Sequence, residues 1–248
     1  DKSYWIDFLI SKLASGTMCD GPSQRDFIIR ELSPRNKTIS TEPGSINGID
    51  QKFYSVPMRT PERNVFSICF VGRKAPGKGL DELLLLAYEC RKRSMNVEFC
   101  IAGPVDESFD NYLKWKEEAV KRLDNVKFVD NLVSPEDVFV SSDALILLSE
   151  REGFSGIVIQ AQASGRPVIC SDIYGLKDTF IDDVTGYSVN ARDISSQISA
   201  INKLQCSTTY TMMSVAAREF ALQFAEHNFT SRLEKAYRDV GFRFSSRE

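Results

Sequence analysis

The segment VFSICFVGRKAPGKGLDELLLLAY, residues 65–88, decides the fold of this chain. Its first part, 65–71, is a short and continuous apolar run that ends at Gly72, which is typical of a strand buried on both faces of a parallel sheet. Its last part, 79–88, is rich in Leu, Glu and Ala, which favour a helix. The segment therefore predicts a strand, a glycine-rich loop and a helix, in that order.

The same alternation continues along the chain. Further apolar runs bounded by turn residues predict strands at 97–102, 126–129, 144–148 and 167–171. Helical patterns between them predict helices over about 107–124, from Pro135 after the N-cap Ser134, and over about 156–164. A chain in which strands and helices alternate favours an α/β fold, a Rossmann-like doubly wound parallel sheet.

Both ends of the chain differ from this pattern. Helical apolar spacing at 5–13, a short apolar stretch at 17–20 and a helix start at 22 are followed by a turn-rich stretch. About 45 residues cannot build a core of their own. We therefore interpret 1–45 as the tail of a preceding domain with its hinge, 46–228 as the main α/β domain, and 229–248 as a C-terminal helix that packs back toward the first part.

Composition excludes several classes of function. Hydrophobic residues make up 42% and charged residues 26%, as in a soluble globular protein, and a net charge of -3 gives no general reason to expect nucleic acid. The six cysteines form no C-x-x-C pair and the chain has one histidine, which argues against a metal site. No run approaches the ~20 apolar residues that span a bilayer. Cysteines within apolar strands are expected to be reduced thiols of a cytoplasmic protein.

The loop at 72–79 is the first candidate site. It joins a strand to a helix, so it lies at the carboxyl end of the sheet, where open α/β sheets bind ligands. Arg73, Lys74 and Lys78 beside a helix N-terminus are suited to a diphosphate. Two alternatives stay open. The loop could be a solvated basic turn, or the P-loop of an NTPase, although Gly79 stands where that motif has its Mg²⁺-binding hydroxyl.

The segment at 149–165 is the second candidate. Gly153 and Gly156 expose backbone N–H groups near a helix start, and Glu152 can accept hydrogen bonds from sugar hydroxyls. Gln160 follows Glu152 by eight residues, about two helical turns, so we expect both on one face. The alternative for Gln160 is a polar residue on an exposed helix face.

Together these segments resemble a known family. Five stretches occur in its order and spacing: GSINGID at 44–50, FVGRKAPGKG at 70–79, SEREGF at 149–154, GRPVI at 165–169 and DVTGY at 183–187. They resemble the hinge, phosphate loop, Ser-x-x-Glu-Gly-Phe segment and later strand-linked segments of glycosyltransferase family 4, retaining enzymes with the GT-B fold. The amino-acid sequences of the first and third stretches look closest to those of bacterial members that build lipid-linked surface oligosaccharides.

The resemblance implies roles for individual residues. Arg73 and Lys78 would hold the donor diphosphate and stabilise it as the leaving group, and Glu152 would contact the donor sugar. Gln160 occupies the second Glu position of the family's Glu-x₇-Glu pattern, so its ribose contact would lack a charge. The remaining donor-binding positions would be Gly72, Gly153, Phe154 and Ser155.

The same resemblance implies partners and limits. The substrates would be a nucleotide-sugar donor such as a UDP-sugar and a glycan or lipid-linked acceptor, with no cofactor, no essential metal and no nucleic acid. The main domain, 46–228, would bind the donor, while the acceptor would bind an N-terminal domain of which 1–45 is the tail. Any peripheral contact with the inner face of the membrane would come through that domain. The chain alone is expected to lack an acceptor site.

Three other interpretations compete with an enzyme of this family. The chain could bind nucleotide sugar without transferring it, as its short N-terminal part and Gln160 suggest. It could be the P-loop-like NTPase described above. A Rossmann-type oxidoreductase ranks last, because no G-x-G-x-x-G follows a strand.

Overall fold

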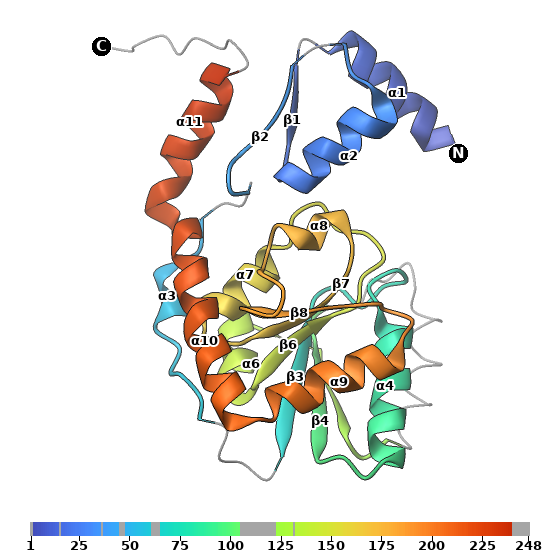
Figure 1. Ribbon diagram of the computed structural model, residues 1–248, viewed down its shortest axis with the longest axis vertical. Helices are drawn as coiled ribbons and strands as arrows, with labels where there is room; N and C mark the ends of the chain where they lie inside the picture. The colour runs from blue at the N-terminus through green and yellow to red at the C-terminus, as the bar shows by residue number, and fades with distance from the viewer. Residues whose placement is uncertain are drawn as a thin grey trace.

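The computed structural model describes residues 2–14, 16–35, 37–44, 48–60, 65–104, 123–130 and 132–239. Within them two separate sheets are found, and Figure 1 shows the smaller one above the larger one. The strands of the larger sheet are β3 (Phe66–Val71), β4 (Val97–Ala102), β5 (Val126–Val129), β6 (Ala144–Leu147), β7 (Val168–Ser171) and β8 (Gly186–Val189). Its helices are α4 (Leu80–Lys92), α6 (Pro135–Ser141), α7 (Gly156–Ala163), α8 (Tyr174–Lys177), α9 (Ile194–Leu204) and α10 (Ser207–Ala221).

The larger sheet is fully parallel and has the order β5-β4-β3-β6-β7-β8. Counted along the chain, this is the 3-2-1-4-5-6 order of a Rossmann fold. The predicted doubly wound α/β sheet is therefore confirmed. The chain leaves β3 toward β4 and leaves β6 toward β7, in opposite directions, so the switch point of the topology lies between the carboxyl ends of β3 and β6.

Burial explains why these strands sit at the centre. All four residues of β6 and of β7 are buried, as the continuous apolar runs predict for strands covered on both faces. Helices α4 and α9 pack against each other, as do α7 and α10. In Figure 1, α6, α7 and α10 gather on one side of the sheet and α4 and α9 on the other.

Several elements were not predicted from the sequence. They are β2 (Thr38–Ser40), α3 (Gln51–Tyr54), α8, β8 and α9. Four of them are only three or four residues long, one of these, β8, begins with a glycine, and α9 carries three serines, so their local signals are weak. The polar helix expected over 107–124 lies outside the described residues except at its last positions, and so do residues 45–47 of the hinge-like segment.

The smaller sheet pairs β1 (Thr17–Cys19) with β2 in parallel, and α2 (Pro22–Leu32) connects them. Helix α1 (Lys2–Leu13) packs on α2, and α2 packs on α8 of the larger domain. The terminal helix α11 (Phe229–Asp239) runs back from the larger domain and contacts β2, as Figure 1 shows. The assignment of 1–45 to an acceptor domain stays a prediction.

Two neighbouring chain segments, at Ile49 and at Ala225, connect the regions of the two sheets. Ile49 pairs with Ala225 in an isolated parallel bridge. The Ile49 N–H donates to the carbonyl of Phe224 at 2.7 Å, and the Glu226 N–H donates to the carbonyl of Ile49 at 3.3 Å. The outgoing and returning chains therefore hold each other through backbone hydrogen bonds.

Candidate functional site

The glycine-rich loop fits closely against the end of β6. Gly79 is the N-cap of α4 with φ of 77°, and a Cβ there would collide with the carbonyl group of Leu148. Gly77 also has a positive φ, 78°, and its carbonyl accepts from the Glu150 N–H at 2.9 Å. Position 79 therefore requires glycine, both because its φ is positive and because a side chain would collide with Leu148. The loop that follows β3 is thereby joined to the loop that follows β6.

The cations of this loop have different surroundings. Lys78 lies with its Nζ 2.8 Å from Oε1 of Glu152, and both side chains are largely buried. Arg73 is exposed at the surface. Lys74 is buried, its ammonium is paired with Asp130 at the end of β5, and it lies over the ring of Phe128. The composition of the loop did not distinguish Lys74 from the other two cations. In the structure its side chain lies against residues of β5 and its end.

Glu152 is held from two directions. Its Oε1 accepts from Lys78 and also from the Oγ of Ser149, at 2.8 Å in each case. Ser149 is fully buried, and it was recognised in the sequence only as part of a motif, with no role. A spacing of three residues across a tight loop was the signal that could have suggested this contact. The carboxylate that was expected to meet the sugar is thus fixed beside the cation that was expected to meet the diphosphate.

The next residues turn toward the smaller sheet. A Cβ on Gly153 would lie 2.8 Å from Oδ2 of Asp20. The ring of Phe154 lies 5.7 Å from that of Phe224 and fills the space where a Cβ on Gly44 would stand. Ser155 is buried at the N-cap of α7, without a side-chain cap. The Phe154 side chain is therefore used in packing, and the predicted donor contacts of Gly153, Phe154 and Ser155 stay a prediction.

Gln160 does not follow Glu152 along one helix, as the eight-residue spacing assumed. It lies in α7 with its side chain partly exposed, whereas Glu152 lies in the loop before that helix. The argument that eight residues are two helical turns was therefore wrong, because the first four of them are not helical. Gln162, two residues further on, is buried and donates to the carbonyls of Val158 and Thr179.

A thiol lies near the site but is not poised for chemistry. Cys170 is completely buried in β7. Burial raises the pKa of its thiol strongly, and the nearby Glu152 carboxylate raises that pKa further. Since the thiolate is the reactive form, Cys170 behaves as a small hydrophobic residue. All six cysteines are free, as expected for reduced thiols.

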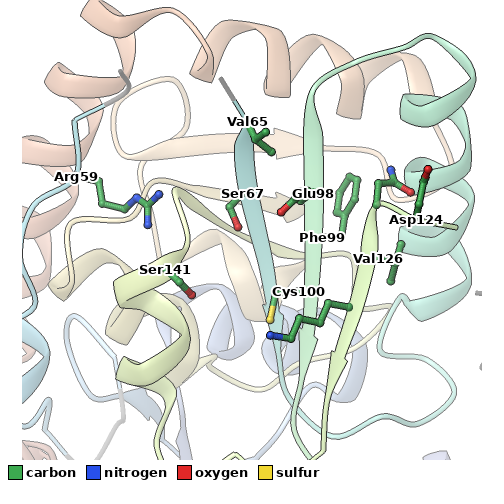
Figure 2. Close-up of a pocket in the computed structure, with 11 residues that line it drawn as sticks. Arg59, Val65, Ser67, Glu98, Phe99, Cys100, Asp124, Val126 and Ser141 are labelled. Atoms are coloured by element: carbon green, nitrogen blue, oxygen red, sulfur yellow. The ribbon is translucent and has the colours of Figure 1, made fainter. Parts of the chain in front are cut away.

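Cavities on the molecule differ in their relation to this site. One of 610 Å³, shown in Figure 2, lies toward the amino ends of β3, β4 and β5, where Ser67 and Glu98 face Arg59 and Ser141. It contains none of the predicted site residues. Another, of 560 Å³, lies at the carboxyl ends of β6, β7 and β8 and is lined in part by Ser149.

The described residues contain neither a metal-binding cluster nor a membrane-spanning helix. No group of three or more His, Cys, Asp or Glu side chains in them could hold a metal ion. None of their helices is both long enough and apolar enough to cross a membrane.

The geometry defines a class of protein. The chain contains a Rossmann-like α/β domain. At its topological switch point a helix N-terminus, a lysine and a carboxylate meet, and this arrangement is suited to a phosphorylated ligand with polar substituents. Residues 59–220 match the family described as glycosyl transferases group 1. The chain belongs to this family.

Individual relatives agree with the family. The chain is 26% identical over 219 residues to the capsular polysaccharide biosynthesis glycosyltransferase CapM of Staphylococcus aureus, covering 81% of this chain and 56% of the relative. It is 28% identical over 209 residues to D-inositol 3-phosphate glycosyltransferase of Corynebacterium diphtheriae, covering 80% of this chain and 47% of the relative. The chain thus spans about half the length of the curated relatives it matches.

Solved structures share the fold. Sucrose-phosphate synthase of Thermosynechococcus elongatus superposes with a TM-score of 0.80 at 19% identity, over 97% of this chain and 62% of the other. The Anabaena protein HepE, solved in complex with UDP and glucose, gives a TM-score of 0.79 at 17% identity, over 96% of this chain and 67% of the other. The fold is therefore that of GT-B glycosyltransferases.

Proposed function

We propose that the chain forms the donor-binding half of a family 4 glycosyltransferase, which transfers a sugar from a nucleoside diphosphate sugar with retention of configuration. The observation that carries the proposal is the meeting of Lys78 and Glu152 at the switch point, with Nζ and Oε1 2.8 Å apart. A cation for the diphosphate and an acceptor for sugar hydroxyls are adjacent, as the two neighbouring parts of a nucleotide sugar require.

The proposed chemistry follows from charge. Departure of the diphosphate leaves an oxocarbenium-like sugar and builds negative charge on the leaving group. Arg73, Lys78 and the N-terminus of α4 would meet that charge, and electrostatic groups fixed in advance are worth the most in a water-poor site. Removing one such group typically costs roughly 3–4 kcal/mol of transition-state stabilisation. Glu152 and the backbone of Gly153 and Phe154 would orient the sugar.

The relatives suggest the substrates. We propose a UDP-sugar as donor, since HepE was solved with UDP and glucose. A glycan or lipid-linked acceptor is proposed from the capsular polysaccharide relative. The acceptor would bind the other half of the enzyme, and the proposed location is the cytoplasm at the inner face of the membrane.

We further propose that donor binding needs no metal ion, because two cations and a helix N-terminus supply the positive charge. Titration of the purified chain with UDP, with and without EDTA, tests this point. Equal affinities are expected, and a loss of binding in EDTA that Mg²⁺ restores would contradict it.

The main test is a calorimetric titration of the purified chain with UDP, GDP and ADP. One diphosphate should bind, and Arg73→Ala and Lys78→Ala should each weaken it by about tenfold or more, the loss expected for a charged hydrogen bond. Lys92→Ala is the matched control, because Lys92 lies at the far end of α4 in an exposed pair with Glu89. Binding that is unchanged in both site variants would reject the proposed diphosphate site.

A second candidate is a protein that binds nucleotide sugar without transferring it, and the uncharged Gln160 favours it. Gln160→Glu tests the ribose contact on which this second candidate rests. If Gln160 serves a weakened ribose contact, the glutamate variant should bind UDP more tightly. If the variant binds UDP no better than wild type, Gln160 does not contact the ribose.

A further inference from the structure

The first turn of α2 is capped by a residue far away in the chain. Its N-cap is Gly21, which has no side chain to offer. Asp178, just after α8, supplies the cap: its Oδ2 accepts from the Ser23 N–H at 2.8 Å, and its Oδ1 accepts from the Ser23 Oγ at 2.7 Å. Both carboxylate oxygens are used, and a negative charge at a helix N-terminus is favourable.

The surroundings leave little freedom for this contact. A Cβ on Gly21 would lie 2.6 Å from Oδ2 of Asp178, so the backbone of α2 approaches the carboxylate as closely as glycine allows. One turn further along α2, the ring of Phe27 stacks on that of Tyr174 with centroids 4.7 Å apart and planes 15° apart. Helix α2 is therefore fastened to α8 at two points.

The opposite side of α8 touches the donor site. Gly175, within α8, lies so close to the Glu152 carbonyl that a Cβ there would collide with it, and that Cβ would lie 2.9 Å from the Gly153 carbonyl. Helix α8 therefore contacts both α2 and the loop that carries Glu152. The start of α2 also meets this loop directly, because a Cβ on Gly21 would lie 3.1 Å from the Phe154 ring. A displacement of α8 would be transmitted to this loop, because backbone atoms in contact cannot yield as side chains do.

We propose that Asp178 is a positioning residue for the donor site. By capping α2 it holds the unit β1–α2–β2 against α8, and α8 in turn sets the position of the Glu152 loop. The role of Glu152 in sugar binding rests on the function proposed above. The mechanical connection from Asp178 through α8 to the Glu152 loop does not.

Hydrogen exchange of the backbone amides tests the connection without any ligand. In Asp178→Ala we expect faster exchange, by roughly fivefold for a lost cap, in the first turn of α2 and also at 150–154. Asp178→Asn keeps an acceptor and should show a smaller effect at both places. Asp172→Asn is the matched control, since Asp172 precedes α8 and its carboxylate forms an exposed pair with Lys177.

Gly21→Ala provides a second variant, because it displaces the carboxylate without removing its charge, and it should reproduce the effect in the first turn of α2. Its Cβ would also meet the Phe154 ring at 3.1 Å, so the 150–154 loop is compared only in the two Asp178 variants. Faster exchange in α2 with an unchanged 150–154 loop, in both Asp178 variants, would reduce Asp178 to a helix cap and overturn the proposal. Unchanged exchange at both places would overturn it as well.

Calorimetry then connects the proposal to the site. In Asp178→Ala the affinity for UDP-glucose should fall several-fold relative to the affinity for UDP, because α8 contacts the backbone of Glu152 and Gly153, which are proposed to orient the sugar. Failure of the wild-type chain to bind UDP would count against the proposed function alone, because the exchange experiment decides the positioning role by itself.

Discussion

The six-stranded domain and the two-stranded unit differ in how much of their own apolar surface they bury. In the large domain β6 and β7 are buried throughout, and helices cover both faces of the sheet. In the small unit α2 has no buried residue, and α1 exposes most of its large apolar side chains, namely Trp5, Ile6, Leu9, Ile10 and Leu13.

The difference shows which region supports the other. The large domain has a core of its own, whereas the small unit is held from outside, by Asp178 and Tyr174 at α2 and by α11 at β2. Few buried contacts imply a low free energy of local opening. Since the small unit also contacts the Glu152 loop, changes in the less stable region should reach the site.

The largest expected effect comes from opening a cavity in the large domain. Phe139 is completely buried and its ring lies 6.2 Å from that of Phe53. Phe139→Ala should lower the free energy of unfolding by about 3–5 kcal/mol. Leu9→Ala, in the exposed face of α1, should change it by no more than about 0.5 kcal/mol. Urea unfolding of both variants checks the comparison, and equal losses would refute the difference in burial.

A somewhat smaller effect is expected in the glycine-rich loop. Gly79→Ala places a side chain at a positive φ and against the Leu148 carbonyl, which should cost about 2–3 kcal/mol. Gly72→Ala is the control, because Gly72 has no positive φ and its Cβ would meet only the Phe70 ring at 3.4 Å. Urea unfolding compares the two variants. A Gly72→Ala variant as unstable as Gly79→Ala would show that the Leu148 contact is not the cause.

Two cysteines compare the opening of the two regions directly. Burial raises the pKa of Cys19, in the small unit, and of Cys90, in the large domain, to about 11 in each case. Opening exposes both thiols and removes the burial that raises their pKa, so their intrinsic reactivities in the opened protein are expected to be similar. The labelling rate of the folded protein then reports how often each region opens. In a Cys100→Ser, Cys206→Ser background, we expect Cys19 to react with a maleimide at least about tenfold faster than Cys90.

Mass spectrometry of the labelled peptides gives both rates. The two serine changes are needed because Cys206 is exposed and Cys100 is half-buried. Equal rates for Cys19 and Cys90 would mean that the two regions open together, which contradicts a small unit of lower local stability.

The smallest effect is expected where the regions join. Tyr54 donates its hydroxyl to the Ala221 carbonyl at 2.7 Å, and burial raises its pKa from 10.0 to about 12. Because the folded state favours the neutral phenol, its contribution is complete below pH 10 and is lost as the pH rises toward 12. Tyr54→Phe should cost about 1 kcal/mol.

Urea unfolding of wild type and Tyr54→Phe at pH 8 and pH 11 isolates the contribution of the Tyr54 hydroxyl to the free energy of unfolding. The difference in free energy between the two proteins should shrink at the higher pH. A constant difference would show that Tyr54 ionises equally in the folded and unfolded states.

The sequence predicted much of the large domain because its signals are local. An apolar run such as 97–102 coincides with β4, and Pro22 begins α2 as its helix start predicted. Short elements escaped prediction. Helix α8, four residues long, carries no periodicity of its own, yet it links α2 to the Glu152 loop.

The candidate site shows the same division. Glycines, cations and a carboxylate at strand ends indicated Arg73, Lys78 and Glu152, because parallel strands bring their carboxyl ends to one edge. Which cation faces the site could not be read from spacing. Lys74 is adjacent to Arg73 in sequence, but it pairs with Asp130, a residue 56 positions away. The spacing from Glu152 to Gln160 was misread because helical geometry was applied across a loop.

By itself the sequence determined the class of fold, the family and the types of residue at the site, since these depend on local pattern and on the order of motifs. Only the tertiary structure decided which side chains meet: Lys78 with Glu152, Lys74 with Asp130, and Ser23 with Asp178. The physical reason is that hydrogen bonds and ion pairs act over about 3 Å. Contacts of that range depend on how distant segments pack, and the spacing of residues along the chain does not contain this information.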